Sequence, residues 1–158
     1  MSIIVREARL EDAEGIIDVL NPIIKTKLYT ALLTPFSIED ERRFILNFPA
    51  QGIFYVAVHD RKIVGLQNVE PFATYTPAFD HVGVIGTYVH LEHQRQGIGK
   101  ALFQATFEAA RSKGYEKLFA YVRSDNATGL ATYLSQGFNQ IGIARKHAKI
   151  NGVYQVNA

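Results

Sequence analysis

The sequence predicts an α/β (α+β) fold in which a twisted, mixed but mostly antiparallel sheet of about seven strands carries helices on both faces. Strand-like segments, which alternate or are rich in β-branched residues, are interspersed with segments whose apolar residues recur at helical spacing. Turn signals join some neighbouring strands, whereas a long amphipathic helix separates two others. No linker rich in Pro, Gly or Ser divides the 158 residues, so we expect a single domain over residues 1–158.

The N-terminal region is predicted to contain a strand at Ile3–Glu7, a helix at Leu10–Leu20 and a second helix that ends near Asn47. Asn21-Pro22 should interrupt the first helix, because proline lacks the amide donor. Residues 22–36 have no clear periodicity, and we expect a mobile segment there. Ser37, with Asp40 three residues later, is a typical N-cap for the second helix.

The central region is predicted to form strands at Ile53–His59, Lys62–Glu70 and Val82–His90, then a helix at Ile98–Lys113 and a strand at Lys117–Arg123. Asp60-Arg61 is a hairpin signal between the first two strands, and Gly114 ends the helix. Because a helix lies between them, Val82–His90 and Lys117–Arg123 should be parallel and joined by a right-handed crossover.

The C-terminal region is predicted to begin with a helix whose apolar stripe is formed by Ala127, Leu130, Ala131 and Leu134. Gly137 should end this helix. Phe138–Ile150 and Gly152–Val156 then form a strand pair joined by the turn signal Asn151-Gly152.

Composition excludes several classes of function. The chain has seventeen Lys and Arg and fifteen Asp and Glu, so its net charge is small, and no run of five basic residues occurs. Neither nucleic-acid binding nor membrane-surface binding is therefore indicated. The absence of cysteine excludes disulfides, thiolate metal sites and cysteine nucleophiles. The five histidines lack ligand spacing, so no metal is expected; His90 and His93 are more often solvated than metal-binding. The chain has no secretory or membrane-spanning pattern, which predicts a cytoplasmic protein.

The most informative segment is a polar loop, Gln94–Lys100, that connects a strand directly to a helix. Gly97 and Gly99 remove side chains where backbone amides would converge on a ligand. The first amides of the helix have no intrahelical acceptor and carry the positive end of the helix dipole, so they suit a pyrophosphate. Arg95 and Lys100 add positive charge beside it.

Other interpretations of this loop remain open. It could be an ordinary strand-to-helix turn that contains two glycines. A dinucleotide-binding loop fits less well, because Leu102 stands where a third glycine is required and no acidic residue closes the next strand. The P-loop pattern is absent, although a regulatory domain that binds another nucleotide phosphate is still an alternative.

Two motifs resemble those of the GNAT superfamily of N-acetyltransferases. Gln94-Arg95-Gln96-Gly97-Ile98-Gly99 resembles its acyl-CoA signature, and Asn126 through Tyr133 to Gly137-Phe138 resembles its Asn-x6-Tyr-x3-Gly-Phe segment. The opening residues Val5–Asp12 resemble the first strand and helix start of the family. The resemblance therefore covers nearly the whole chain, with the motifs in the family's order.

The resemblance implies a GNAT-like sheet, with its two central parallel strands splayed, and acetyl-CoA as the cofactor. It places Thr87, Tyr88 and Val89 along the pantetheine arm and the amides of residues 94–99 on the pyrophosphate. Asn126 would hydrogen-bond the pantetheine where the strands splay. The implied cofactor-binding residues are Thr87, Tyr88, Val89, Gln94, Arg95, Gln96, Gly97, Ile98, Gly99, Lys100 and Asn126.

Tyr133 is the candidate general acid, which would protonate the departing thiolate. It is seven residues from Asn126, so on a helix the two lie within about 20° of each other. The alternative is a tyrosine packed at the edge of the core. The candidates for the general base are Glu70, Asp80 and His81, and a water relay would also serve.

The loop Phe72–His81 resembles that of the phosphinothricin-type acetyltransferases within the superfamily. Those enzymes have the order Glu-x-Ser-Val-Tyr-Val in the next strand. Here Val84 stands at the Glu position and Gly86 at the Ser position. This departure argues against the same substrate class and against a base at position 84.

The sequence thus predicts an acetyl-CoA-dependent N-acetyltransferase that acts on a small-molecule amine by direct attack in a ternary complex. Residues 22–36 and 71–80 should form the walls of the acceptor pocket, and their aromatic and weakly basic composition favours an amino acid or amino-acid analogue. The alternatives are a non-catalytic acyl-CoA-binding regulatory module and a protein N-terminal acetyltransferase. A homodimer is possible by the same resemblance.

Overall fold

The structure is a computed structural model that describes residues 2–157. The chain divides into two compact units, one made of Met1–Leu20 and Phe36–Ala120 and the other of Asn21–Pro35 and Tyr121–Ala158. Among the described residues, no helix is both long and apolar enough to cross a membrane, and no group of three His, Asp or Glu residues could hold a metal ion.

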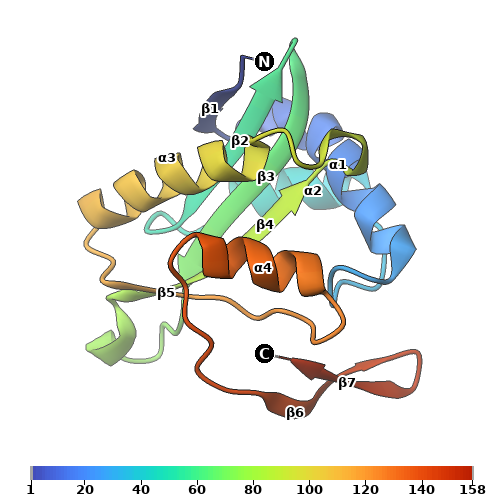
Figure 1. Cartoon of the computed structure of the whole chain (residues 1–158). Helices are drawn as coiled ribbons and strands as arrows, with labels where there is room; N and C mark the ends of the chain where they lie inside the picture. Colours follow the sequence, from blue (N-terminus) through green and yellow to red (C-terminus); the bar gives the residue numbers. More distant parts are fainter. Residues whose placement is uncertain (1, 158) are drawn as a thin grey trace. The chain divides into compact units, whose positions relative to one another are not determined.

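The first unit contains a five-stranded sheet (Figure 1). Its strands are β1 (Ile4–Glu7), β2 (Ile53–His59), β3 (Lys62–Pro71), β4 (Val82–Val89) and β5 (Lys117–Phe119). The spatial order follows the chain, and each neighbouring pair is antiparallel except β4 and β5, which are parallel. Asp60 and Arg61 both have positive φ, 48° and 64°, as a tight two-residue hairpin turn requires. The mixed, mostly antiparallel sheet is confirmed.

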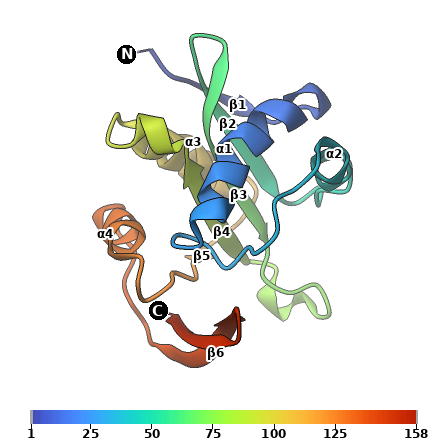
Figure 2. The same cartoon turned by 90° about the vertical axis from the view of Figure 1, so that its right-hand side faces the viewer.

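Helices cover both faces of this sheet. α3 (Ile98–Ser112) lies on one face, and α2 (Ile38–Leu46) with the first part of α1 (Ala13–Thr26) lies on the other (Figure 2). α3 approaches β3 so closely that a Cβ on Gly65 would lie 2.8 Å from Ile98 Cγ2. Gly65 therefore sets the distance between helix and sheet. Three short 3-10 helices, η1 (Leu10–Asp12), η2 (Pro77–Phe79) and η3 (Leu91–His93), complete the unit.

Two predictions about helix boundaries meet different outcomes. Ser37 caps α2 as predicted, since its hydroxyl accepts the Asp40 amide and the Asp40 carboxylate accepts the Ser37 amide. The predicted break at Asn21-Pro22 is wrong, because α1 continues through Pro22 to Thr26. Burial of Val19, Leu20, Ile23 and Ile24 on both sides of the proline offsets its lost hydrogen bond.

β5 is shorter than predicted. It pairs with β4 over three residues only, from Val82 opposite Lys117 to Val84 opposite Phe119, rather than extending to Arg123. The second half of β4 thus continues beyond the strand that is parallel to it. The apolar residues in 120–123 match the pattern of a strand. Val122 and Arg123 are indeed buried, but neither pairs with β4.

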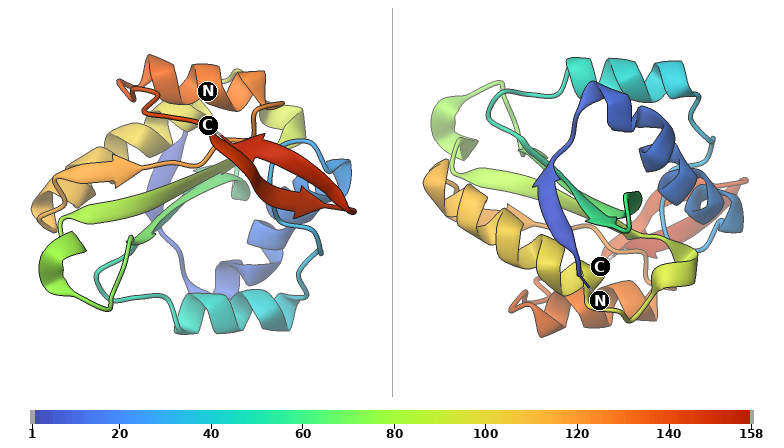
Figure 3. Two further views of the ribbon diagram at one scale, coloured as in Figure 1. Left: turned by 90° about the horizontal axis from the view of Figure 1, so that it is seen from below. Right: turned by 90° about the horizontal axis from the view of Figure 1, so that it is seen from above.

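The second unit contains α4 (Ala127–Ser135) and a separate ribbon of β6 (Ala144–Ile150) and β7 (Val153–Asn157), visible in Figure 3. Asn151 and Gly152 form its turn with φ of 51° and 79°. The seven predicted strands are present, but five belong to one sheet and two to this ribbon. Residues 138–143, predicted as strand, have no strand pairing.

The predicted apolar stripe of α4 is not a core-facing stripe. No residue of α4 is buried, and Leu134 is 47% exposed. Helical spacing correctly indicated that one side of α4 is apolar. It could not show whether other residues pack against that side.

Glu41 of α2 is buried, at 4% exposed, and burial raises the pKa of its carboxyl from 4.5 to about 7. Because the folded chain holds this proton more tightly than the unfolded chain, unfolding free energy should fall as pH rises from about 4.5 to about 7. Glu41→Gln should remove this dependence and stabilise the protein at pH 8 by up to about 3.5 kcal/mol, since each pKa unit between 4.5 and about 7 corresponds to about 1.4 kcal/mol. Urea unfolding of both proteins at pH 5 and pH 8 measures it; equal pH dependence in the two would contradict this assignment.

Candidate functional site

The loop after β4 is closed by its own hydrogen bonds. The Gln94 side-chain amide donates to the Val89 carbonyl at 2.8 Å, and the His93 backbone amide donates to the His90 carbonyl at 2.9 Å. Gly97 then adopts the left-handed conformation, φ 80°, as the N-cap of α3. The loop is therefore a defined structure that leads directly into the helix.

The N-terminus of α3 has the features of an anion site. Gly97 is the N-cap and has no side chain to bond the first helix amides, and the first turn has no acidic residue. The first intrahelical bond runs from the Ala101 amide to the Gly97 carbonyl. A Cβ placed on Gly97 or Gly99 would meet no other atom within 4 Å, so open space lies over both glycines. The free helix dipole and this space fit a phosphate group.

Ile98 lies between the two glycines and has a different role. Its side chain is 1% exposed and packs in a core cluster with Ala57, Val64 and Leu102. Only the backbone of Ile98 can therefore contact a ligand. The anchored side chain fixes the amides on either side of it.

One face of the β3–β4 pair carries a polar strip. Asn68 is opposite Gly86 and Glu70 is opposite Val84, so these residues share one face of the sheet. A Cβ on Gly86 would lie 3.3 Å from Asn68 Oδ1 and 3.7 Å from the Tyr88 ring, which places both side chains beside Gly86. Glu70 is exposed at the end of this strip.

On the opposite face, Gln67 and Thr87 are cross-strand partners. The Gln67 side-chain amide donates to Thr87 Oγ1 at 2.9 Å, although Gln67 is fully buried. This bond fixes the side chain of Thr87, one of the three residues assigned to the pantetheine arm.

In the second unit, Asn126 is the N-cap of α4 rather than a residue inside the helix. Its Oδ1 accepts the Gly129 amide at 2.9 Å. A Cβ on Gly129 would lie 2.5 Å from Asn126 Nδ2, so glycine is needed there for the cap to form. Tyr133 is half-buried in α4, and its ring contacts the Phe138 ring edge-on at 5.1 Å.

Residues 23–138 match the acetyltransferase (GNAT) family. The chain belongs to this family. The GNAT protein is 32% identical over 89 residues to N-acetyltransferase 8 of Homo sapiens; the match covers 56% of the chain and spans 39% of that relative's length. It is 23% identical over 154 residues to phosphinothricin N-acetyltransferase of Streptomyces coelicolor, covering 95% of this chain and 90% of that one.

A similar solved structure is that of a GNAT superfamily phosphinothricin acetyltransferase from Sinorhizobium meliloti in complex with AcCoA. Its TM-score is 0.88 at 19% identity, covering 99% of this chain and 88% of that one. This likeness confirms the fold expected from the sequence, and the family matches confirm the resemblance.

The sequence-predicted base candidates of this GNAT protein differ in their surroundings. Glu70 lies within β3, directly opposite Val84. Asp80 is an exposed residue that ends η2. The backbone carbonyl of His81 accepts the amides of Glu116 and Lys117, and its side chain is exposed. Among the three, only Glu70 is held in a strand beside other polar side chains.

The remaining predicted cofactor residues lie in two places. Gln94, Arg95, Gln96 and Lys100 are exposed around the helix start, and Arg95 has a positive φ of 60°. Thr87, Tyr88 and Val89 lie together at the end of β4.

Sequence reasoning did not single out two buried polar residues, Gln67 and Arg123. Gln67 gave no signal, because a single glutamine in a strand pattern looks like a surface residue. Arg123 stands two residues before Asp125 and three before Asn126, and this charged pair next to a candidate ligand-binding residue could have drawn attention to it.

Gly99→Ala should separate ligand binding from stability. The new methyl group would occupy the open space over the helix start and weaken acetyl-CoA binding by about tenfold or more, or ~1.4 kcal/mol. The same change should raise stability by up to about 1 kcal/mol, since glycine disfavours helix. Calorimetric titration and urea unfolding measure the two effects. Gly142→Ala, where the Cβ also meets nothing, is the control; normal binding by Gly99→Ala would show that the ligand lies elsewhere.

Proposed function

We propose that this GNAT-family chain is an acetyl-CoA-dependent N-acetyltransferase acting on a primary amine of a small molecule, and that residues 1–158 act as one catalytic domain. The observation that carries the proposal is the start of α3. Open space lies over Gly97 and Gly99, and the N-cap has no side chain that bonds the first helix amides. Such a site holds the pyrophosphate of a CoA thioester. When bound, acetyl-CoA supplies the activated acetyl group.

The pantetheine arm follows β4 from this site. Thr87, Tyr88 and Val89 line it, and Gln67 holds Thr87 in place through the 2.9 Å hydrogen bond. Asn126 contributes its side-chain amide, which the cap to Gly129 orients.

Glu70 acts as the general base that removes a proton from the acceptor ammonium. Its register opposite Val84 puts their Cβ atoms about 4.5–5.5 Å apart on one face. A carboxylate at Glu70 can therefore reach the space beside Val84. Asp80 and His81 lie outside the β3–β4 pairing and do not share this strip.

Tyr133 acts as the general acid. Its phenol donates a proton to the departing thiolate, so that the products are an N-acetyl amide and free CoA. The edge contact with Phe138 fixes the ring from one side, which favours a single position of the hydroxyl.

The acceptor carries an apolar or aromatic side chain. Phe72 stacks edge-on against Phe79 at 5.5 Å and Phe119 at 6.0 Å, and Tyr75 contacts Phe79 at 6.0 Å. Phe72 and Tyr75 nevertheless remain 40% and 83% exposed, so this cluster offers an aromatic surface beside the end of β3 and Phe119, the last residue of β5. An amino acid or amino-acid analogue suits it better than a polycation, which would require carboxylates.

The test is the release of free CoA from acetyl-CoA across a panel of amines. The panel contains apolar and polar amino acids, spermidine and a short peptide with a free N-terminus. Turnover with an aromatic or apolar amino acid supports the proposal in full. Faster turnover of the peptide would point to a protein N-terminal acetyltransferase, and a preference for spermidine would overturn the aromatic acceptor class. Binding of acetyl-CoA with no turnover on any amine would point to a regulatory module.

A further inference from the structure

The two units of the chain differ in charge. The unit of Asn21–Pro35 and Tyr121–Ala158 contains six Lys and Arg but a single acidic residue, Asp125, which gives a side-chain charge of +5. The other unit contains eleven Lys and Arg and fourteen Asp and Glu, which gives a charge of −3. The two charges largely cancel in the whole chain, which is why its composition indicated no nucleic acid. Charge asymmetry of this kind points to a polyanionic partner for the basic part.

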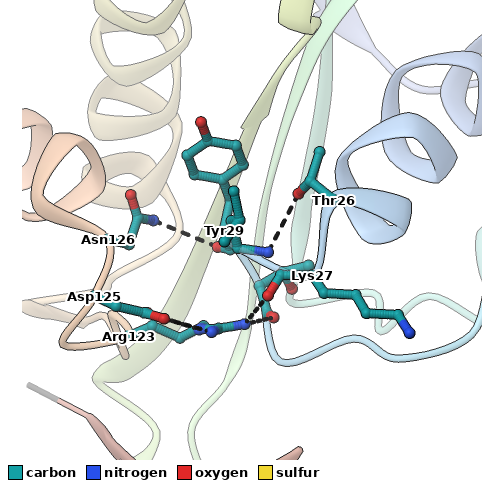
Figure 4. A network of polar contacts seen from close by, with 8 residues as sticks. Thr26, Lys27, Tyr29, Arg123, Asp125 and Asn126 are labelled. Atoms are coloured by element: carbon teal, nitrogen blue, oxygen red, sulfur yellow. Dashed lines mark hydrogen bonds and ion pairs between the residues drawn. The ribbon is translucent and has the colours of Figure 1, made fainter.

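The single acidic side chain of the second unit is already neutralised. Arg123 is 7% exposed, and its Nε and Nη2 donate to the two carboxylate oxygens of Asp125 at 2.9 and 2.6 Å (Figure 4). Its Nη1 donates to the backbone carbonyls of Lys27 at 2.8 Å and Thr30 at 3.0 Å. No other acidic side chain of this unit can therefore pair with its remaining cations. These five exposed residues are Lys25, Lys27, Arg145, Lys146 and Lys149.

A bulge displays the basic residues of β6, in the ribbon drawn in red in Figure 3. The pairing with β7 shifts between Ala144 and Ala148, so β6 has three residues where β7 has one. The three are Arg145, Lys146 and His147, and all are exposed. Lys146 has a φ of 53°, a left-handed conformation that a residue with a Cβ disfavours. Bulges re-aim side chains and are common beside functional sites, and strained residues cluster at such sites too.

Aromatic rings lie among these cations. Tyr121 stacks on His147, with 5.9 Å between the ring centroids and 15° between the planes. Lys146 and Lys149 hold their Nζ atoms 5.7 and 5.1 Å from the centroid of the Tyr154 ring. The two tyrosines are 51% and 54% exposed. Cations bind phosphates and aromatic rings stack on bases, so the combination fits a nucleic-acid single strand better than an acidic protein.

We propose that the exposed side chains around this ribbon bind a single-stranded nucleic acid. The basic ribbon surface consists of Tyr121, Arg145, Lys146, His147, Lys149 and Tyr154. Its Lys and Arg residues contact phosphates, and the Tyr121–His147 pair stacks against a base. Charge and stacking are common to all bases, so binding is independent of sequence. No residue of this surface has a role in the proposed acetyl transfer, and the inference does not depend on that function.

The salt dependence of binding tests the phosphate contacts. Fluorescence anisotropy with a labelled 12-nucleotide oligo(U) should show log K falling with log salt concentration at a slope of about −2, because about three phosphates are neutralised. Binding at 200 mM salt should thus be about 20-fold weaker than at 50 mM. Lys146→Gln and Lys149→Gln should each flatten the slope by about 0.7.

Lys62→Gln is the matched control for these variants. It also removes one exposed positive charge, but from the start of β3 in the first unit, so it should keep the wild-type slope. Equal flattening by Lys62→Gln and Lys146→Gln would overturn the proposal, since the effect would then come from net charge alone. Failure of the wild-type protein to bind oligo(U) at 50 mM salt would overturn it as well.

An abasic oligonucleotide of the same length tests the stacking contact, because it carries phosphates without bases. The wild-type protein should bind oligo(U) at least about fivefold more tightly than the abasic strand. Tyr121→Ala should lose most of this preference, and Tyr121→Phe, which keeps the ring, should retain it. Equal binding of both strands by the wild-type protein overturns the proposal, whether or not Tyr121→Ala folds.

A poly-glutamate peptide distinguishes an acidic protein partner from a nucleic acid. The peptide carries one negative charge per residue but offers no base to stack. At equal concentration of negative charge, it should displace labelled oligo(U) at least about tenfold less effectively than unlabelled oligo(U) does. Equally effective displacement would overturn the proposal and assign the surface to an acidic protein.

Discussion

Tyr133→Phe should lower kcat by a factor of about 10²–10⁴, the range expected when a general acid is lost. The substitution removes only the hydroxyl, so the edge contact with Phe138 and the packing of α4 should be retained. Acetyl-CoA affinity should therefore be unchanged. Single-turnover measurement of CoA release, with calorimetric binding of acetyl-CoA, separates the chemical step from binding.

Tyr154→Phe is the control for Tyr133→Phe. Tyr154 is 54% exposed on β7, where Lys146 and Lys149 lie over its ring, and its hydroxyl has no part in the proposed reaction. It should turn over at the wild-type rate. An unchanged single-turnover rate for Tyr133→Phe would remove this tyrosine from the mechanism.

Glu70→Gln should lower kcat/KM by about 10²–10⁴ for an acceptor amine that is protonated at the assay pH. The amide keeps the size of the side chain but cannot accept the proton. An arylamine, in which the amino group is bonded directly to the aromatic ring, is already neutral at the same pH. The variant should acetylate it at close to the wild-type rate. Measuring both acceptors with both proteins isolates the proton-removal step.

The matched controls for Glu70→Gln are the other two candidates. Asp80→Asn and His81→Gln should retain activity with either amine, because both residues lie outside the β3–β4 register. A large loss in either control, or equal losses of Glu70→Gln with protonated and neutral amines, would reject Glu70 as the base.

Sequence predicted the parts of the fold that local chemistry determines. The Asp60-Arg61 turn, the cap at Ser37 and the glycine-rich start of α3 each depend on residues within a few positions of one another. Because the interactions that form these three features join residues close together in the chain, the local sequence pattern was enough to predict them.

The predictions failed where distant packing decided the outcome. Pro22 remains helical because buried neighbours offset its lost bond, and no local pattern reveals those neighbours. Residues 120–123 have the composition of a strand, yet β5 ends at Phe119. Arg123 appeared to be a strand residue, whereas its guanidinium binds carbonyls almost a hundred positions earlier in the chain.

The same limits apply to the candidate site. The loop with Gly97 and Gly99 could be predicted as a phosphate site because a phosphate needs backbone amides that side chains do not cover. No choice among Glu70, Asp80 and His81 followed from the sequence, because the register that puts Glu70 opposite Val84 is a property of two strands together.

The anchoring of Ile98 has a practical consequence for finding ligands. Because the side chain between Gly97 and Gly99 is part of the core, the amides at the helix start are in place only while that core is intact. A ligand of these amides therefore binds the native chain alone, and by mass action one present at a hundred times its Kd adds about 2.7 kcal/mol to the unfolding free energy. Melting temperature can thus rank CoA thioesters of different acyl length before any acceptor amine has been identified.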